Sequence, residues 1–486
     1  MANDHRTPNP TLTNRLMRFV WPTPASDLPE RVRRRVLLYL IPYLFFLYIL
    51  AYIDRVNVSV AALGMAKPPA EHGLGFDARI LGFGAGVFFW GYWILEMPST
   101  LSVLRWGARS VFVRILVLWG LSCLLLGFIG LPWMDRLLGW LPAVNRWPLG
   151  GWLLDRIPHQ PDEPTVAQFY FLRFLLGLFE GASSPSVILY LSLWFRPCDR
   201  GRAIATFMAA IPVSSMIGSP LSGAMLQLDW FGLPGWRWLL ILEGAPAVVL
   251  GIASLLYLTD WPRQARWLSD EQRDWLLEEM KRENEEKQPS GRASFWEAMA
   301  RRDVWFLCLA YFGGTTGEYG LSLWLPKILQ RLGNLSAVRT ALLTAIPSLT
   351  AIPAMVLWGA RSDRTAERRW HAAIPRFVAG ASLAAIAAQS LGVPAALAAF
   401  SVATAGIVAA YGPLWAIPTS ILGSSAAAAS IGLINAFGNI GGFAGPYIIG
   451  WFSSRTGEYA GGLWSVAAAL VCSGVFALLV RARSSN

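Results

Sequence analysis

The stretch LYILAYIDRVNVSVAALGMA, residues 47–66, places an acid and a base, Asp54 and Arg55, inside an otherwise apolar run. A single charge at the centre of a bilayer costs at least about 2.5–3.5 kcal/mol, so a membrane helix that keeps two of them suggests a function. Helix neighbours point about 100° apart, so the two side chains need separate partners. Tyr52 and Ser59 share the face of Arg55. A solvated helix end, a structural ion-pair network and an anion site are the three interpretations.

The composition of the whole chain indicates whether this stretch lies in water or in a membrane. The 486 residues are 55% hydrophobic and 15% charged, with a mean hydropathy of +0.44, which is too apolar for a soluble protein of this size. Apolar stretches of about 20 residues, enough to cross about 30 Å of hydrocarbon, occur at twelve places. They cover 37–63, 79–101, 110–130, 168–194, 202–226 and 237–258, then 304–329, 339–360, 374–391, 394–418, 427–452 and 461–480. We therefore predict an all-α polytopic membrane protein with twelve transmembrane helices in two six-helix halves.

The domain plan follows from these spans. It has an N-terminal tail (1–36), a first half (37–258) with an external insertion (131–167), a linker (259–303), a second half (304–480) and a C-terminal tail (481–486). The net charge of +11 could suggest nucleic acid, but Lys and Arg concentrate in the tail and in loops of one side, as in RVRRR at 31–35. That is the positive-inside pattern, with both termini cytoplasmic. We expect a multi-pass protein of the plasma membrane, in contact with lipid and not with nucleic acid.

Cysteine, histidine and short motifs argue against an enzyme. The four cysteines are widely spaced, the four histidines are dispersed, and no metal-binding cluster, GxSxG, HExxH or P-loop pattern is present. The glycines of GFGAG at 82–86 lie within an apolar span and favour helix packing over nucleotide binding. We expect no metal and no cofactor, with a proton gradient as the energy source of any transport.

A second pair of charges lies in the span 168–194. Arg173 and Glu180 are seven residues apart, which is two turns on one helical face, or about 10 Å. Both can point into one cavity, and Gly177 and Gly181 allow a neighbouring helix to approach. An acid inside a membrane tends to be protonated near neutral pH and can carry protons, so Glu180 is a candidate proton site. The alternative is a buried salt bridge that only holds helices together.

Further polar residues of the first half have structural or gating interpretations. Glu96 is apolar-flanked and could pair with Arg105 or Arg109 in the following loop. Ser214 and Ser215 lie near mid-depth in the fifth span. A repeat connects the halves, because residues 107–110 and 359–362 are both Gly-Ala-Arg-Ser. The loops after the second and eighth spans, with Arg361 and Asp363 in the latter, are therefore predicted to have matching gating roles.

The second half should supply selectivity. The candidates are Tyr311, Glu318, Tyr319 and Trp324 in the seventh span, Tyr411 and Trp415 in the tenth, and Asn435 and Asn439 in the eleventh. Asn435 and Asn439 are four residues apart and share one helical face. For the aromatic residues, packing is the main alternative to substrate contact.

The sequence resembles the anion:cation symporter (phthalate permease) family of the major facilitator superfamily from about residue 35 to 480. The resemblance is carried by AYIDRVNVSVAA (51–62), YWILEMPSTLSVLRWGAR (92–109), LRFLLGLFEGASSPSVILYLSLWF (172–195), GWRWLLILEGAPAV (235–248) and YGLSLWLPKIL (319–329). Similar proteins move sugar acids, tartrate, aromatic acids and nicotinate, often with protons. Two features depart from the family: Glu318 stands where small or polar residues are usual, and Ser214–Ser215 replaces a glutamine.

The resemblance implies that Arg55 contacts the substrate carboxylate, that Asp54 and Glu180 take up protons, and that Arg173 partners Glu180. Guanidinium matches a carboxylate and stays charged when buried, which agrees with this assignment. We expect proton-coupled uptake of a small organic anion by a functional monomer in a bacterial inner membrane. A cation exporter, an exchanger of another small molecule and a non-transporting receptor are the alternatives.

Overall fold

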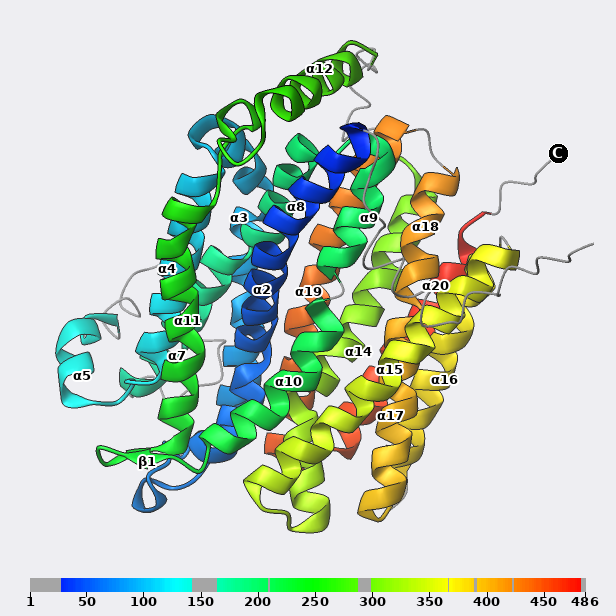
Figure 1. Cartoon of the computed structure of the whole chain (residues 1–486). Coiled ribbons are helices and arrows are strands. Elements are labelled where there is room, and N and C mark those ends of the chain that lie inside the picture. The colour runs from blue at the N-terminus through cyan, green and yellow to red at the C-terminus, as the bar shows by residue number, and fades with distance from the viewer. Residues whose placement is uncertain are drawn as a thin grey trace, which may run out of the picture.

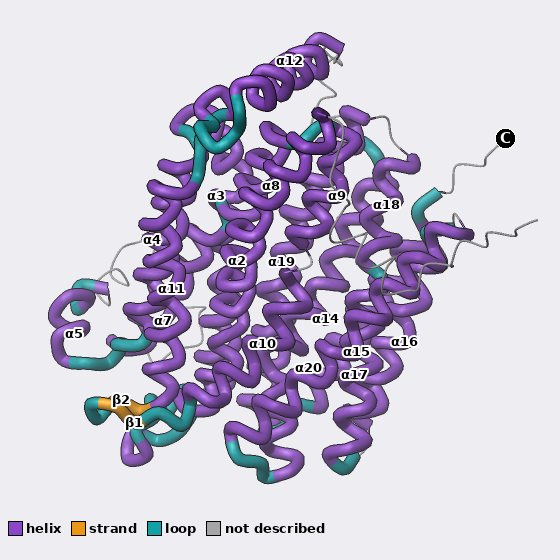
Figure 2. Tube along the Cα trace, viewed as in Figure 1, coloured by secondary structure: helices purple, strands orange, loops and turns teal. Residues whose placement is uncertain are grey.

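The computed structural model describes residues 28–141, 164–208, 210–286, 299–365, 367–388, 391–421 and 424–481. These residues form a bundle of long helices (Figure 1). The one strand pair among them is a short antiparallel hairpin of β1 (Asp229–Trp230) and β2 (Leu233–Pro234), shown in orange in Figure 2.

The helices of the first half match its six predicted spans. They are α2 (Leu28–Met65), α3 (Ala78–Trp106), α4 (Ala108–Leu126), α7 (Pro164–Glu180) with α8 (Ser183–Trp194), α9 (Pro197–Met208) with α10 (Ala210–Met225), and α11 (Gly235–Tyr257). Shorter connecting elements are η1 (Pro69–Glu71), α5 (Pro132–Leu138), η3 (Pro262–Gln264) and α12 (Asp270–Glu286). The predicted insertion 131–167 contains α5, and its residues 142–163 lie outside the described ranges.

The second half repeats the plan. Its helices are α14 (Arg302–Gly333), α15 (Ala337–Thr365), α16 (Arg369–Ala388), α17 (Val393–Ala409) with α18 (Tyr411–Ile421), α19 (Ser424–Thr456) and α20 (Ala460–Leu479). Where the residues at the break are described, two spans are interrupted, one in each half, and in each a proline lies in the first turn after the break, Pro185 in α8 and Pro413 in α18. Proline lacks the N–H that a continuous helix would need at that position.

Nine helical segments of the described chain are long and apolar enough to cross a membrane. The other predicted spans are also helical: α9 with α10, α14 and α19. Polar and small residues lower the hydropathy of α14, which contains GGTTGEYG (313–320), and of α19, which contains NAFGNIGG (435–442). Polar residues in a spanning helix normally face a protein interior or a cavity, so these two helices are expected to carry functional side chains.

The halves meet through three helix pairs: α2 packs against α14, α3 against α19, and α10 against α15. Glycine permits the close approach of α3 and α19. A Cβ at Gly82 would lie 2.7 Å from the carbonyl oxygen of Pro446, and one at Gly450 would lie 2.4 Å from that of Ala78. Small residues at such contacts let membrane helices pack backbone to backbone. The interface is therefore sensitive to side-chain size.

The two ends of the bundle differ. We call the end that carries α12 the linker end, and the end that carries β1 and β2 the hairpin end (Figure 1). Arg31, near the start of α2, lies 4.0 Å from Glu271 of α12. The backbone N–H of Arg481 donates to Asp303 at the start of α14, at 3.1 Å. Both ends of the described chain therefore lie at the linker end.

Candidate functional site

Arg55 lies at the centre of the interface between the halves. Its Nε and Nη2 both donate to Oε1 of Glu180, at 2.8 and 2.5 Å, and its Nη1 donates to the Tyr319 hydroxyl at 3.2 Å. Glu180 is the last residue of α7 in the first half, whereas Tyr319 belongs to α14 in the second. The rings of Tyr92 and Tyr52 lie 5.1 and 5.7 Å from the guanidinium carbon. One side chain of α2 thus joins both halves through a forked set of donors.

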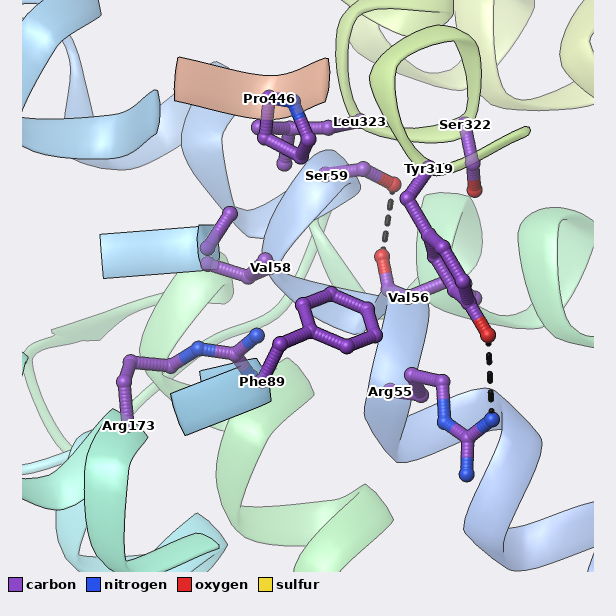
Figure 3. A pocket seen from close by; sticks show the side chains of 11 residues that line it. Arg55, Val56, Val58, Ser59, Phe89, Arg173, Tyr319, Ser322, Leu323 and Pro446 are labelled. Carbon is purple, nitrogen blue, oxygen red and sulfur yellow. Dashed lines mark hydrogen bonds between the residues drawn. The ribbon is translucent and has the colours of Figure 1, made fainter. Parts of the chain in front are cut away.

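A cavity of about 290 Å³ adjoins this arginine (Figure 3). Its polar lining residues are Arg55, Ser59, Arg173, Tyr319 and Ser322, and its apolar ones are Val56, Val58, Ala85, Phe89, Leu323 and Pro446. Both halves contribute side chains. Ligand sites are commonly concave, mostly apolar and fitted with a few polar groups, and the lining of this cavity has that character. It suits a small anion, because both charged lining residues are arginines.

Arg173 is almost fully buried and lacks the predicted partner. Its Nε donates to the carbonyl oxygen of Gly84 at 3.2 Å, its guanidinium lies 5.0 Å from the Phe88 ring, and its Nη1 has no hydrogen bond to any residue in the described ranges. Glu180 bonds Arg55 instead. The two-turn spacing keeps Arg173 and Glu180 apart along α7, whereas α2 brings Arg55 directly to the acid. Arg173 therefore has an unused donor beside the cavity.

Asp54 points away from the cavity, although Arg55 follows it directly in sequence. Its Oδ1 accepts from Asn57 at 3.3 Å and from Cys123 of α4 at 3.5 Å, and its other oxygen has no hydrogen-bond partner within the described part of the chain. Glu243 of α11, which interacts electrostatically with Asp54, accepts from the Ser222 hydroxyl at 2.5 Å. Both acids are buried. They form a second polar cluster between α2, α4, α10 and α11.

Glu318 lies among tyrosines from both halves. It accepts hydrogen bonds from Tyr52 of α2, at 3.3 Å, and from Tyr411 of α18. The Tyr311 ring lies 5.7 Å from that of Tyr411 and 4.8 Å from that of Trp415, so Trp415 belongs to the same aromatic group.

Sequence reasoning missed Arg376 of α16. It lies near the start of the predicted span 374–391, where a basic residue normally marks topology, yet its side chain is 1% exposed. Its guanidinium lies 4.7 Å from the Tyr411 ring, and its Nη1 and Nη2 have no hydrogen-bond partner in the described chain. A Cβ at Gly314 would lie 2.3 Å from Nη2, so α14 makes room for this arginine with a glycine. The sequence feature that could have identified Arg376 as buried is the apolar stretch around it, IPRFVAGA (374–381).

Glu96, Asn435 and Asn439 were assigned separate roles but form one cluster. Nδ2 of Asn435 donates to one carboxylate oxygen of Glu96, and Nδ2 of Asn439 donates to the other at 2.8 Å. The acid belongs to α3 and both amides belong to α19, so the bonds connect the two halves.

The remaining predicted residues lie elsewhere. The Ser214 hydroxyl donates to the Ile211 carbonyl of its own helix at 2.7 Å, so it turns into the helix. The side chain of Ser215 is outside the described part of the structure. Trp324 donates to the Pro446 carbonyl, which is a packing contact within the second half.

The proposed gating loops lie away from Glu96. The backbone N–H of Arg109 donates to Asp260 at 2.8 Å, and Arg368 donates to Asp363 at 2.5 Å. Arg105 and Arg361 are exposed. Glu96 points to α19 instead of the loop arginines, because the helical rise from residue 96 to 109 separates them by several turns.

Comparison with known proteins gives consistent results. Residues 44–446 match the family model of the Major Facilitator Superfamily. The chain is 39% identical over 458 residues to a "Putative tartrate transporter" of Agrobacterium vitis, covering 94% of this chain and 96% of that protein. It is 32% identical over 458 residues to a "Quinolone resistance transporter" of Acinetobacter baumannii, covering 94% and 97%. A bacterial homologue of the human lysosomal transporter Spinster, in an inward-facing and unoccupied conformation, has a similar fold, with a TM-score of 0.67, 16% identity and coverage of 92% and 95%.

Proposed function

The chain belongs to the Major Facilitator Superfamily, and from this premise we propose that it takes up a small organic carboxylate together with protons. Membership confirms the all-α fold expected from the sequence and makes the chain a multi-pass membrane transporter, not an enzyme. The resemblance to tartrate and related acid permeases is likewise confirmed. The coupling ion, the substrate class and the residues involved are the content of the proposal.

The observation that carries the proposal is the Arg55 guanidinium, which borders a cavity lined by both halves and is held by a single carboxylate. A planar guanidinium offers paired donors that fit a carboxylate. Protonation of Glu180 removes the negative charge that holds Nε and Nη2. The arginine can then give the same two donors to a substrate carboxylate, so proton uptake and anion binding favour each other.

Arg173 and Asp54 extend this coupling. Arg173 interacts electrostatically with both Glu180 and Asp54, although it donates a hydrogen bond to neither. Asp54 has no cation among its described hydrogen-bond partners and is costly to keep charged, whereas Glu180 becomes costly to keep charged when Arg55 turns from it to the substrate. We assign Asp54 and Glu180 as proton sites, with Arg173 as the charge that responds to both. Glu318 is a third candidate, because it is held by tyrosines alone among its described hydrogen-bond partners.

Transport then follows by alternating access. Protons and the anion bind while the site faces the outside, the halves rock about the α2–α14, α3–α19 and α10–α15 contacts, and the site opens inside. We place the linker end and both termini in the cytoplasm of a bacterium, with the protein in the inner membrane. One chain contains both halves of the site, so a monomer is sufficient.

An acid such as tartrate is our preferred substrate class, because both charged residues of the cavity lining are arginines and because the relative from Agrobacterium vitis is named for tartrate. Export of a larger molecule is the second candidate, because a relative of similar coverage is named for quinolone resistance. The two candidates differ in direction. Uptake should be driven by an inward proton gradient, whereas an exporter would move its substrate against the proton flow.

Binding provides the first experiment. Purified protein is melted with and without tartrate at pH 5.5 and pH 8, since a ligand stabilises the folded state by RT ln(1 + [L]/Kd). We expect a larger stabilisation at pH 5.5, because protonation frees Arg55. The Arg55→Ala variant should melt cooperatively with no response to tartrate. Stabilisation by organic cations and by no carboxylate would refute the proposal.

A further inference from the structure

Glu96 is bound as a substrate carboxylate would be bound. Each of its two oxygens accepts one amide N–H from α19, one from Asn435 and one from Asn439. The two asparagines are one turn apart on the same face of the helix, so their donors point in one direction. Two parallel N–H donors on one carboxylate give both affinity and a fixed orientation. The pair is therefore a preformed carboxylate receptor that is filled by a side chain of the opposite half.

This receptor lies next to Arg55. Tyr92 precedes Glu96 by one helical turn on α3, and its ring lies 5.1 Å from the Arg55 guanidinium carbon. Glu96 also interacts electrostatically with Arg55. Because α3 runs from the hairpin end to the linker end, Glu96 lies one turn nearer the linker end than Tyr92. The amide pair does not line the cavity beside Arg55, so the two groups that could bind a carboxylate are separated by about one turn of α3.

Acids of the chain itself bind both carboxylate-binding groups: Glu180 forms an ion pair with Arg55, and Glu96 accepts hydrogen bonds from the Asn435–Asn439 pair. We propose that Glu96 is an internal ligand at a second carboxylate subsite formed by Asn435 and Asn439, and that a dicarboxylate substrate displaces both acids. This inference rests on the proposed function and specifies it further. A monocarboxylate would displace Glu180 alone.

Displacement of Glu180 and Glu96 determines how many protons accompany the substrate. A displaced Glu96 carboxylate loses two amide donors, and it takes one proton from a hydronium ion on the open side: one O–H bond of the hydronium breaks as the carboxyl O–H bond forms, and a water molecule is released. Charged and titratable groups that interact electrostatically with Glu96 include, among the described residues, Arg55 of α2, Tyr92 of α3 and Tyr311 of α14, and Glu180 of α7 interacts in turn with Tyr92. The two displaced acids therefore take up two protons for one dianion, so this exchange adds no net charge, and a proton on Asp54 is counted in addition.

A purely structural lock between α3 and α19 is the alternative. A lock biases the two halves for every substrate equally, because it acts on the conformational equilibrium. An internal ligand competes only with substrates that need the amide pair. The two explanations therefore differ in whether Glu96 distinguishes one carboxylate from two.

The test compares tartrate with tartramate, in which an amide replaces one carboxylate. Dissociation constants for the purified full-length protein are measured by titration calorimetry at one pH, for the unmodified protein, Glu96→Gln and Asn439→Leu. Glu458→Gln is the matched control, because it makes the same change at an exposed acid beyond α19. Removal of the competing carboxylate should tighten tartrate about tenfold in Glu96→Gln, with tartramate changed less than about twofold. In Asn439→Leu, tartrate should weaken to the level of tartramate.

The outcomes separate the inference from the proposed function. Equal shifts for tartrate and tartramate in Glu96→Gln, or weaker tartrate binding, would overturn the internal-ligand assignment and leave carboxylate transport standing. Failure of the unmodified, folded protein to bind either acid would overturn both. Uptake in vesicles provides a second readout: each tartrate should enter with one proton fewer in Glu96→Gln than in the unmodified protein.

Discussion

Asp54 and Arg55 are adjacent in sequence, but they belong to different regions of the molecule. Arg55 faces the cavity, donates to an acid of its own half and to a tyrosine of the other half, and borders the space where an anion can bind. Asp54 faces the packed interior of the first half and contacts Asn57 and Cys123. One helical step of about 100° separates the proposed anion-binding region from the proposed proton-binding region. Neighbouring charges can therefore have independent roles, coupled only through side chains such as Arg173.

The largest expected effect comes from Arg55. Truncation of one partner of a buried, hydrogen-bonded charge pair costs about 2–5 kcal/mol, which corresponds to at least about a 30-fold loss of affinity. Arg55→Ala should abolish tartrate uptake into proteoliposomes, and Arg55→Lys should recover only a small part, since an ammonium lacks the fork. Normal uptake by Arg55→Ala, at equal insertion, would remove Arg55 from the anion site.

The next effect should come from Glu180, the acid that shares Arg55 with the substrate. Glu180→Gln keeps the shape and one acceptor but cannot exchange a proton, so gradient-driven accumulation should disappear while exchange of internal for external tartrate persists. Counterflow and accumulation are measured in the same vesicle preparation. Unchanged accumulation under a proton gradient would exclude Glu180 from coupling.

A smaller and different effect is expected from the polar cluster of Asp54 and Glu243, which lies on the side of α2 away from the cavity. Asp54→Asn should leave the tartrate dissociation constant within about threefold, because Asp54 makes no contact with the cavity, yet it should reduce the pH dependence of uptake. Glu243→Gln is the matched variant, as it retains a side-chain acceptor for the Ser222 hydroxyl. Complete loss of tartrate binding in Asp54→Asn would show that the two regions are not separable.

The smallest effect concerns stability outside the spans. Glu367 precedes α16, and the pKa of its carboxyl group is lowered overall. Partial burial raises this pKa, but hydrogen bonds from the backbone N–H groups of Trp370 and His371 and from the His371 ring lower it by more. Loss of such a cap costs about 1 kcal/mol, so Glu367→Ala should lower the melting temperature by a few degrees with uptake unchanged.

The pH dependence of this cap follows from linkage. Because the folded-state pKa of Glu367 is depressed, its stabilisation is complete above the unfolded value of about 4.3 and is lost as the pH falls through the lower folded-state pKa. The difference between the unmodified protein and Glu367→Ala should therefore shrink in melts below about pH 4. A difference that grows on acidification would contradict the assigned cap.

The sequence predicted the helices because they depend on apolar length, and it singled out Arg55 because a charge in lipid is costly; the structure places Arg55 between the halves and beside a cavity, and its role stays a prediction. The partner of Glu180 was not predictable, because it depends on how α2 packs against α7. Arg376 was missed because charges near span ends normally mark topology, and only the glycine at 314 creates space for it inside the second half. The junction of Glu96 with Asn435 and Asn439 likewise depends on the α3–α19 contact between the halves.

The most direct test of the central claim records tartrate entry and external pH together. Purified protein is reconstituted in vesicles without a pre-formed proton gradient, labelled tartrate is added outside, and the proton movement is followed in weak buffer. The account predicts that the external medium becomes alkaline as tartrate enters, and that both signals vanish in Arg55→Ala. Tartrate entry with no pH change, or with acidification of the medium, would contradict proton-coupled uptake.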